Sequence, residues 1–279
     1  QFNVINSGKH AGIENDIQEH MIMPIMAKNF SESLRMGVEV YHELKGLLKK
    51  KFGASGILLG DEGGFAPKIN SINARLEIIK KAIEKAGYAK EIKLALDCAA
   101  SEFYLPKKYQ YIIKNKKYSS GQLIDFYSVL IEKFDIISIE DGMAEDDWQG
   151  WKEMTKNLGN KIQIVGDDLL VTNVERINKA VYSKACNSLL LKVNQIGTVT
   201  EAINAAKIAF KNKWAVVVSH RSGETEDSFI ADLVVGLDAG QCKFGAPARS
   251  ERNAKYNQLS RIEEELENKA RYFKYFKFK

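Results

Sequence analysis

The feature that most constrains the fold of this chain is a series of apolar runs, each of which ends in a charged side chain. The five clearest runs are residues 93–97 (KLALD), 136–140 (IISIE), 162–167 (IQIVGD), 188–192 (SLLLK) and 215–221 (AVVVSHR). They begin roughly 25–45 residues apart, which is the spacing of βα units. A charge at the end of a buried strand costs free energy unless it is paired or binds something. The pattern therefore predicts one site assembled from several strand ends.

The other segments predict two early strands and a helix after most later strands. Residues 2–6 and 21–25 are expected to be strands, and residues 57–60 a short third one. Apolar residues recur with a helical period over residues 29–51 and 69–86. Further helices are expected at residues 122–134, 173–184, 198–212, 224–238 and 251–267.

Two early strands followed by six strand–helix units give eight strands, and a short piece at residues 241–244 precedes the last helix. The prediction is an α/β fold, a mostly parallel closed barrel of the TIM type, in a single domain over residues 1–279. An open doubly wound sheet is the alternative. It would normally carry a glycine-rich phosphate turn after its first strand, and residues 7–12 (SGKHAG) do not match G-x-G-x-x-G.

Composition excludes several classes of protein. The formal charge of +5 is small for 279 residues, and charges of both signs interleave, so nucleic-acid binding has little support. The cysteines Cys98, Cys186 and Cys242 are widely spaced, as in a reducing compartment, with no disulfide or zinc pattern. No membrane span and no signal peptide are expected. The chain opens on a strand-like run without an initiator Met, so we expect it to be a fragment.

Three of the strand-end charges are carboxylates, Asp97, Glu140 and Asp167. Carboxylates that converge in a barrel mouth repel one another unless a cation lies between them. Oxygen ligands without Cys or His favour Mg²⁺ over zinc. The alternative is that each acid caps a helix or forms a salt bridge. Asp168 is expected to point to the other side of its strand and to be structural.

Lys192 ends a run of three leucines. Its ammonium group could extend to solvent along apolar surface or lie close to a metal. Apolar walls and a nearby cation both disfavour the ammonium form, so we expect a lowered pKa and a usable base.

Glu62 lies in a glycine-rich loop, residues 60–64 (GDEGG), that follows an apolar segment. Glu19 precedes the second strand and could face the same mouth. Two such carboxyl groups could share a proton, with one kept protonated by its neighbour. The simpler interpretation of the glycines is a tight turn.

Residues 219–225 (SHRSGET) join a strand to a predicted helix. An Arg, hydroxyl groups and helix-start amides are what a phosphate group needs, although Ser222 or Thr225 could instead cap the helix. Lys243 in the next strand could bind a second anionic group. His10, in a glycine-flanked loop, is weak evidence by itself. Together these residues suggest proton abstraction beside a carboxylate, with a metal stabilising the dianion and an acid assisting a leaving group.

Six motifs make the chain resemble the enolase family: residues 60–64 (GDEGG), 96–99 (LDCA), 138–142 (SIEDG), 165–168 (VGDD), 191–197 (LKVNQIG) and 219–225 (SHRSGET). They occur in the family's order and cover nearly the whole chain. The resemblance implies phosphopyruvate hydratase, which interconverts 2-phosphoglycerate and phosphoenolpyruvate in glycolysis. It also implies a barrel that begins ββαα before six βα units. Gly142, Met143 and Gly166 resemble the bacterial form of the motifs.

The resemblance implies a role for each matching residue. Asp97, Glu140 and Asp167 resemble the ligands of Mg²⁺, Lys192 the acceptor of the C2 proton, and Glu62 the proton donor to the departing hydroxyl.

Other catalytic positions are Glu19 and, in the proton network, His220. Substrate-binding positions are His10, Gln18, Glu19, Arg221, Ser222 and Lys243, with Lys243 facing the substrate carboxylate. Phe244 departs from the usual Thr, and Ser7 stands where the family usually has a second Gly.

Family members begin with an N-terminal α+β domain, whose mobile loop binds a second magnesium, and no segment here matches it. We therefore expect this chain alone to bind one Mg²⁺ and to turn over poorly. The resemblance also implies a cytoplasmic enzyme that is a homodimer or higher oligomer at full length. Alternatives are a related enzyme acting on another carboxylate, or a cell-surface scaffold that binds host proteins through its basic, aromatic tail, residues 271–279.

Overall fold

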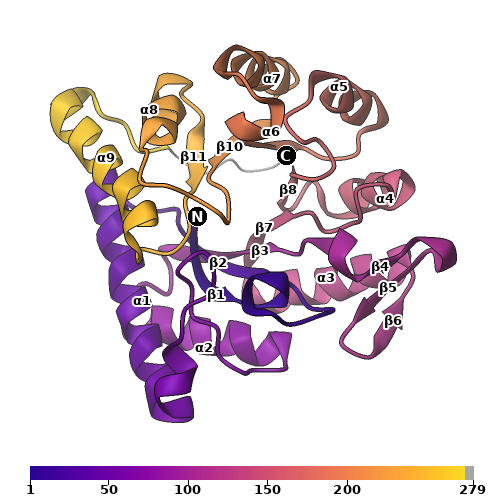
Figure 1. The fold of residues 1–279 in the computed structure, drawn as a ribbon, viewed down its shortest axis with the longest axis horizontal. Helices are drawn as coiled ribbons and strands as arrows, with labels where there is room; N and C mark the ends of the chain where they lie inside the picture. The colour runs from indigo at the N-terminus through magenta and orange to yellow at the C-terminus, as the bar shows by residue number, and fades with distance from the viewer. Residues whose placement is uncertain (274–279) are drawn as a thin grey trace.

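The structure is a computed structural model that describes residues 1–273, and its centre is one curved sheet of eight strands (Figure 1). In pairing order the strands are β1 (Phe2–Asn6), β2 (Glu19–Pro24), β3 (Ile92–Asp97), β7 (Ile136–Glu140), β8 (Gln163–Gly166), β9 (Ser188–Leu191), β10 (Ala215–Ser219) and β11 (Gly240–Lys243). β2 is antiparallel to both of its neighbours, and the other pairs are parallel. The predicted TIM-type barrel is confirmed.

The first and last strands of the sheet meet. The amino group of Gln1 donates to Cys242 O at 2.8 Å, and Asn3 N donates to Gly245 O at 3.2 Å. These bonds bring β1 beside β11, so little of either edge strand is left open.

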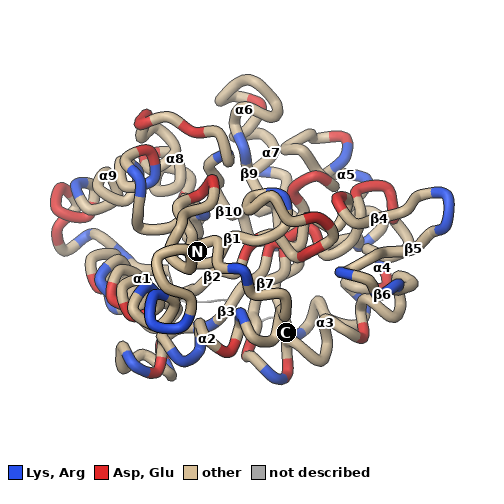
Figure 2. The backbone as a smooth tube through the Cα atoms, turned by 60° about the horizontal axis from the view of Figure 1, so that its bottom comes forward, with Lys and Arg blue, Asp and Glu red and all other residues tan. Residues whose placement is uncertain are grey.

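Helices surround the sheet (Figure 1). They are α1 (Phe30–Phe52), α2 (Ile72–Lys85), α3 (Ser120–Phe134), α4 (Trp148–Leu158), α5 (Val174–Ser183), α6 (Val193–Ile196), α7 (Val199–Lys211), α8 (Phe229–Gly236) and α9 (Ser250–Leu266). Two helices separate β2 from β3, and one or more follow each later strand of the barrel, which is the expected ββαα(βα)₆ order. Charges of both signs interleave along outer helices such as α1 and α9 (Figure 2). Within residues 1–273, the helices lack the length and apolarity needed to cross a membrane.

Two sequence-based expectations are wrong. Residues 57–60 are not a strand: Leu58 and Leu59 are exposed, and only isolated bridges form here, between Leu59 and Phe65 and between Ile5 and Phe65. The segment expected as a helix over residues 224–238 becomes helical only at Phe229. Residues 221–228 before it are irregular, with a few bends.

Two elements were not anticipated. α4 is capped by Asp147, whose side chain accepts from Gly150 N at 2.9 Å. A small antiparallel sheet of β4 (Tyr104–Leu105), β5 (Gln110–Ile113) and β6 (Lys116–Tyr118) is inserted after β3. The turn between β5 and β6 contains Lys114.

The core lies mostly between the sheet and the helices, and small apolar clusters fill the barrel. One such cluster contains Val165, Leu190 and Val217, from neighbouring parallel strands. Packing inside the barrel fixes the strand register, which pairs Glu19 with Asp97 and Asp97 with Glu140. The carboxyl ends of the parallel strands therefore converge at one mouth.

Candidate active site

Lys243, the last residue of β11, joins three carboxylates at the mouth of the barrel. Its Nζ donates to Asp97 Oδ2 and Glu140 Oε1, both at 2.8 Å, and lies 3.3 Å from Glu19 Oε2. All four side chains are buried. Burial lowers the pKa of Lys243, but the charges of Asp97, Glu140 and Glu19 outweigh it and raise that pKa well above its usual value. The predicted strand-end residues of β2, β3, β7 and β11 are thus in one cluster.

Asp167 and Lys192, which follow β8 and β9, form a second ion pair at the mouth. Gln195 Nε2 also donates to Asp167 Oδ1 at 2.9 Å. Burial lowers the pKa of Lys192, but Asp167 and Glu140 together raise it above its usual value. The expectation of a lowered pKa is therefore wrong for the site as it stands here, because the neighbouring carboxylates stabilise the ammonium form.

The three predicted metal ligands interact, but they form ion pairs with two different lysines. Burial, followed by the charges of Asp97 and Asp167, raises the pKa of Glu140 well above its usual value, so the three carboxylates repel one another. Asp97 and Glu140 meet at Lys243, whereas Asp167 faces Lys192. The all-oxygen donor set fits a hard divalent cation, and the two ammonium groups show that positive charge is favoured here.

Within residues 1–273, two compact groups have candidate ligand atoms that all lie within 4.8 Å of one another: His10–Glu19–Glu62 and Asp141–Asp167–Asp168. Both could hold a divalent cation. The second group corrects the expectation that Asp168 points away from Asp167. β8 ends at Gly166, so strand alternation no longer applies to these two residues. Burial and the charge of Asp167 raise the pKa of Asp168 to about 6.

Asp141 is a residue that the sequence reasoning missed. Its buried carboxylate accepts from Asp167 N at 2.9 Å and from Asp168 N at 2.8 Å, and so sets the path of the chain through both acids. Its position directly after Glu140 was the available signal.

Glu19 and Glu62 form the predicted pair of carboxyl groups, with two histidines beside them. His10 Nδ1 lies 3.4 Å from Glu19 Oε1 and 3.8 Å from Glu62 Oε1, and His220 Nε2 lies 3.2 Å from Glu62 Oε2. Asn3 Nδ2 donates to the same Glu62 oxygen at 3.0 Å. Asn3 had no sequence signal, because its partner is distant along the chain.

The pKa values of this pair move in opposite directions. Burial and the charge of Glu62 raise the pKa of Glu19 well above its usual value. Burial would also raise the pKa of Glu62, but His220, Lys243 and His10 lower it well below its usual value. These opposite shifts favour protonation of Glu19 over protonation of Glu62.

The loop after β10 is held by Arg252 of α9, which the sequence reasoning also missed. The buried guanidinium of Arg252 donates to Arg221 O and Ser222 O, both at 2.7 Å, and to Asp61 O at 3.1 Å, and it contacts the His220 ring. Arg221 Nη1 donates to Asn194 Oδ1 at 3.2 Å, and Ser222 is exposed. Because α8 begins only at Phe229, its first amides do not adjoin Arg221 as expected.

Gln18 lies at the rim of the mouth through its main chain. Gln18 N donates to Asp97 O at 3.1 Å, and its carbonyl accepts from Ser7 N at 2.7 Å. Phe244, the departure from the family pattern, is buried beside Tyr256, with ring centroids 6.1 Å apart.

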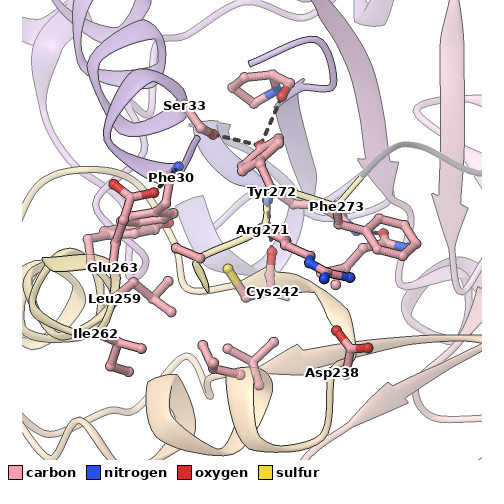
Figure 3. A pocket seen from close by; sticks show the side chains of 18 of the residues that line it. Phe30, Ser33, Asp238, Cys242, Leu259, Ile262, Glu263, Arg271, Tyr272 and Phe273 are labelled. Atoms are coloured by element: carbon pink, nitrogen blue, oxygen red, sulfur yellow. Dashed lines mark hydrogen bonds between the residues drawn. The ribbon is translucent and has the colours of Figure 1, made fainter. Parts of the chain in front are cut away.

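A cavity of about 560 Å³ lies at the opposite end of the barrel (Figure 3). Phe2, Pro24 and Gly240 in its wall belong to strand ends remote from the acids. Tyr272 covers part of it, and its hydroxyl hydrogen-bonds to Pro24 O at 2.9 Å and to Ser33 Oγ at 2.8 Å. The start of the predicted binding tail is thus packed, and residues 274–279 lie outside the described residues.

The fold and the site define a β/α barrel whose candidate catalytic groups, carboxylates and lysines, lie at the carboxyl ends of its strands. The chain belongs to the family described as "Enolase, C-terminal TIM barrel domain", whose sequence model matches residues 1–278. The family predicted from the motifs is therefore confirmed.

Two curated relatives, both named Enolase, are similar to the chain over 97% of its length. That of Thermococcus gammatolerans is 57% identical over 272 residues, and that of Solanum lycopersicum is 54% identical over 278 residues. The chain spans 63% of the length of each. Neither relative is bacterial, so the resemblance of Gly142, Met143 and Gly166 to the bacterial form of the motifs stays a prediction.

Proposed function

We propose that this chain is the barrel domain of an enolase, which interconverts 2-phosphoglycerate and phosphoenolpyruvate. The observation that carries the proposal is the contact of Lys243 with Glu19, Asp97 and Glu140. It unites a carboxyl pair suited to proton transfer with carboxylates suited to a metal, in one buried cluster. Membership of the enolase barrel family and the two relatives named Enolase support the same activity.

In the proposed reaction, neutral Lys192 takes the proton from C2 of 2-phosphoglycerate. The electrons of the broken C–H bond move onto the substrate carboxylate and then form the C2–C3 double bond as the 3-hydroxyl leaves. Glu62, paired with Glu19, supplies the proton that makes the leaving group water. Because the pKa shifts favour a proton on Glu19, we propose that this proton passes to Glu62 before this step.

Asp97, Glu140 and Asp167 are proposed to hold Mg²⁺. When bound, the ion would neutralise these carboxylates, stabilise the substrate dianion and lower the pKa of Lys192 towards the working range of a base. Asp167 and Glu140 raise the pKa of Lys192, so neutralising these carboxylates would remove the cause of that rise.

The substrate has two anionic ends, and the mouth offers cationic or hydrogen-bonding groups for both. Arg221 and Ser222 are proposed for the phosphate, and Lys243 for the carboxylate. His10 and Gln18 are proposed to complete the substrate site.

Assembly and location are proposed from the family resemblance alone: a cytoplasmic enzyme, oligomeric at full length. Binding of host proteins at a cell surface stays a prediction, and a different carboxylate substrate has no support from the relatives. Because those relatives are longer than this chain, we also expect the 279 residues alone to turn over poorly.

The test is a coupled assay for phosphoenolpyruvate on this chain and on its full-length gene product, with and without Mg²⁺. Magnesium-dependent formation of phosphoenolpyruvate by the full-length protein is the expected result. Absence of both turnover and magnesium-dependent binding of 2-phosphoglycerate would overturn the proposal.

A further inference from the structure

The loop that connects β1 to β2, residues 7–18, carries His10 and contains a buried carboxylate, Asp16, that the proposed reaction does not use. Its two oxygens accept from five donors: Ser7 Oγ at 2.8 Å, Ile17 N at 3.0 Å, Arg75 Nη1 at 2.8 Å, Arg75 Nη2 at 2.6 Å and Lys114 Nζ at 2.7 Å. Burial would raise the pKa of Asp16, but hydrogen bonds from Arg75, Lys114 and Ser7 lower it. Asp16 is therefore ionised and fully hydrogen-bonded.

The donors to Asp16 come from elements far apart in the sequence. Arg75 belongs to α2, and it also donates to Ile69 O at 2.7 Å and to His20 Nε2 at 3.0 Å. His20 directly precedes Met21 on β2 and follows Glu19, so the network reaches the backbone of the acid pair.

Lys114 comes from the turn of the inserted small sheet. Besides its ion pair with Asp16, its backbone N–H donates to Asn15 O at 2.7 Å. Asp16 thus joins the loop to a helix on one side and to the inserted sheet on the other.

His10 itself has few contacts that could hold it in place. Its Nδ1 approaches Glu19 and Glu62 but, in the described part of the chain, has no hydrogen-bond partner. Its carbonyl accepts a long bond from Asp61 N at 3.4 Å. Asn15 and Gly8 have positive φ, 53° and 51°, so the loop follows a path that needs external support.

We propose that Asp16 is a positioning residue that holds the β1–β2 loop so that the His10 ring stays beside Glu19 and Glu62, and that Arg75 and Lys114 act through it. The inference rests on the proposed function, in which His10 contacts the substrate. A purely structural role would stabilise the whole barrel without a selective effect on this loop.

The test measures the loop without substrate. Backbone amide exchange of residues 7–18 and the ring resonances of the four histidines are recorded by NMR on the 279-residue chain. In Asp16→Asn, loop exchange should accelerate about 10- to 100-fold relative to core amides, the range for losing hydrogen bonds to a charged group. The His10 resonance should shift while that of His42 stays unchanged.

Two further variants keep the proposal falsifiable. Asp16→Asn combined with Arg75→Gln removes the unpaired buried guanidinium, so global stability should recover while loop exchange stays fast. If global stability recovers and loop exchange also returns to its slow rate in the double variant, the proposal is overturned. If Asp16→Asn does not fold, Lys114→Gln replaces it, because Lys114 is partly exposed. Unchanged loop exchange in Lys114→Gln would likewise overturn the proposal.

Asp147→Asn is the matched control. Asp147 also accepts several hydrogen bonds, from Gly150 N, Tyr111 Oη and Ser120 Oγ, but these partners lie outside the β1–β2 loop. If Asp147→Asn accelerates amide exchange in residues 7–18 relative to core amides, the proposal is contradicted.

Binding of 2-phosphoglycerate in Mg²⁺ is then measured separately, and the dissociation constant should rise about tenfold or more in Asp16→Asn. Unaltered affinity in a variant whose loop has loosened would overturn the positioning claim. Absence of binding by the unmodified chain would count against the proposed function and leave the exchange result standing.

Discussion

Lys243 Nζ donates to Glu140 Oε1 at 2.8 Å, so the last strand of the barrel is tied to β7 across its mouth. The same ammonium reaches Asp97 and Glu19. One cation therefore balances three buried carboxylates, and each contact depends on the others.

Replacing Lys243 by Met should destabilise the chain by about 3–5 kcal/mol, the usual cost of leaving buried charges unpaired. Urea unfolding measures the change. Mg²⁺ should restore more stability to this variant than to the unmodified chain, because the freed carboxylates would be available to the ion. Lys161→Met, which removes an exposed pair with Glu132, is the control and should change stability by less than about 1 kcal/mol. Equal effects of the two substitutions would refute the account of the cluster.

Asp167→Asn should weaken Mg²⁺ binding by at least about tenfold, since one proposed ligand loses its charge. Titration calorimetry with the metal alone measures this affinity. Asp125→Asn, an exposed substitution on α3, is the control and should bind Mg²⁺ as the unmodified chain does. The same affinity in both variants would remove Asp167 from the proposed ligand set.

The prediction for pH concerns Glu19. Because burial and Glu62 raise its pKa in the folded chain, its contribution to stability is complete below the pKa of an unfolded Glu, about 4.3. That contribution is lost as the pH rises through the folded-state pKa. Glu19→Gln mimics the protonated form, so its free energy of unfolding relative to the unmodified chain should increase from about pH 5 to about pH 8.

Urea unfolding at several pH values checks this trend. Glu14→Gln, an exposed change in the same loop, is the control for the substitution itself. A difference for Glu19→Gln that stays constant with pH would contradict the raised pKa of Glu19.

Arg252→Lys should loosen the loop at residues 219–225. A lysine keeps the charge but cannot donate to the carbonyls of Arg221, Ser222 and Asp61 at once. The dissociation constant for 2-phosphoglycerate should rise about 10- to 100-fold, and amide exchange in the loop should accelerate. Arg261→Lys, exposed on the same helix, is the control. Tight binding by Arg252→Lys would show that the loop does not need this support.

The barrel could be predicted from the sequence because strand ends and helix periods are local signals. The same reasoning failed for residues 57–60, where an apolar composition does not reveal that Leu58 and Leu59 are exposed. α4 had a usable signal in its cap Asp147 and in the spacing of its buried Trp151, Met154 and Leu158.

The residues of the candidate site also divide into those with a local sequence signal and those without one. Asp97, Glu140, Asp167 and Lys192 could be found because each follows an apolar run. Arg252 could not be found, because its partners Asp61 and Arg221 are distant in the sequence and only the fold brings them together. The apolar run before Lys192 indicates burial, which lowers its pKa, but it does not reveal the charges of Asp167 and Glu140, which raise it.

The proposed reaction depends on the removal of the C2 proton of 2-phosphoglycerate by Lys192. The most direct measurement is exchange of that proton with solvent deuterium, followed by NMR in the presence of Mg²⁺. It is made on the full-length gene product and its Lys192→Ala variant. We expect exchange in the unmodified protein and none above background in the variant. Exchange retained in a folded Lys192→Ala protein would contradict this expectation.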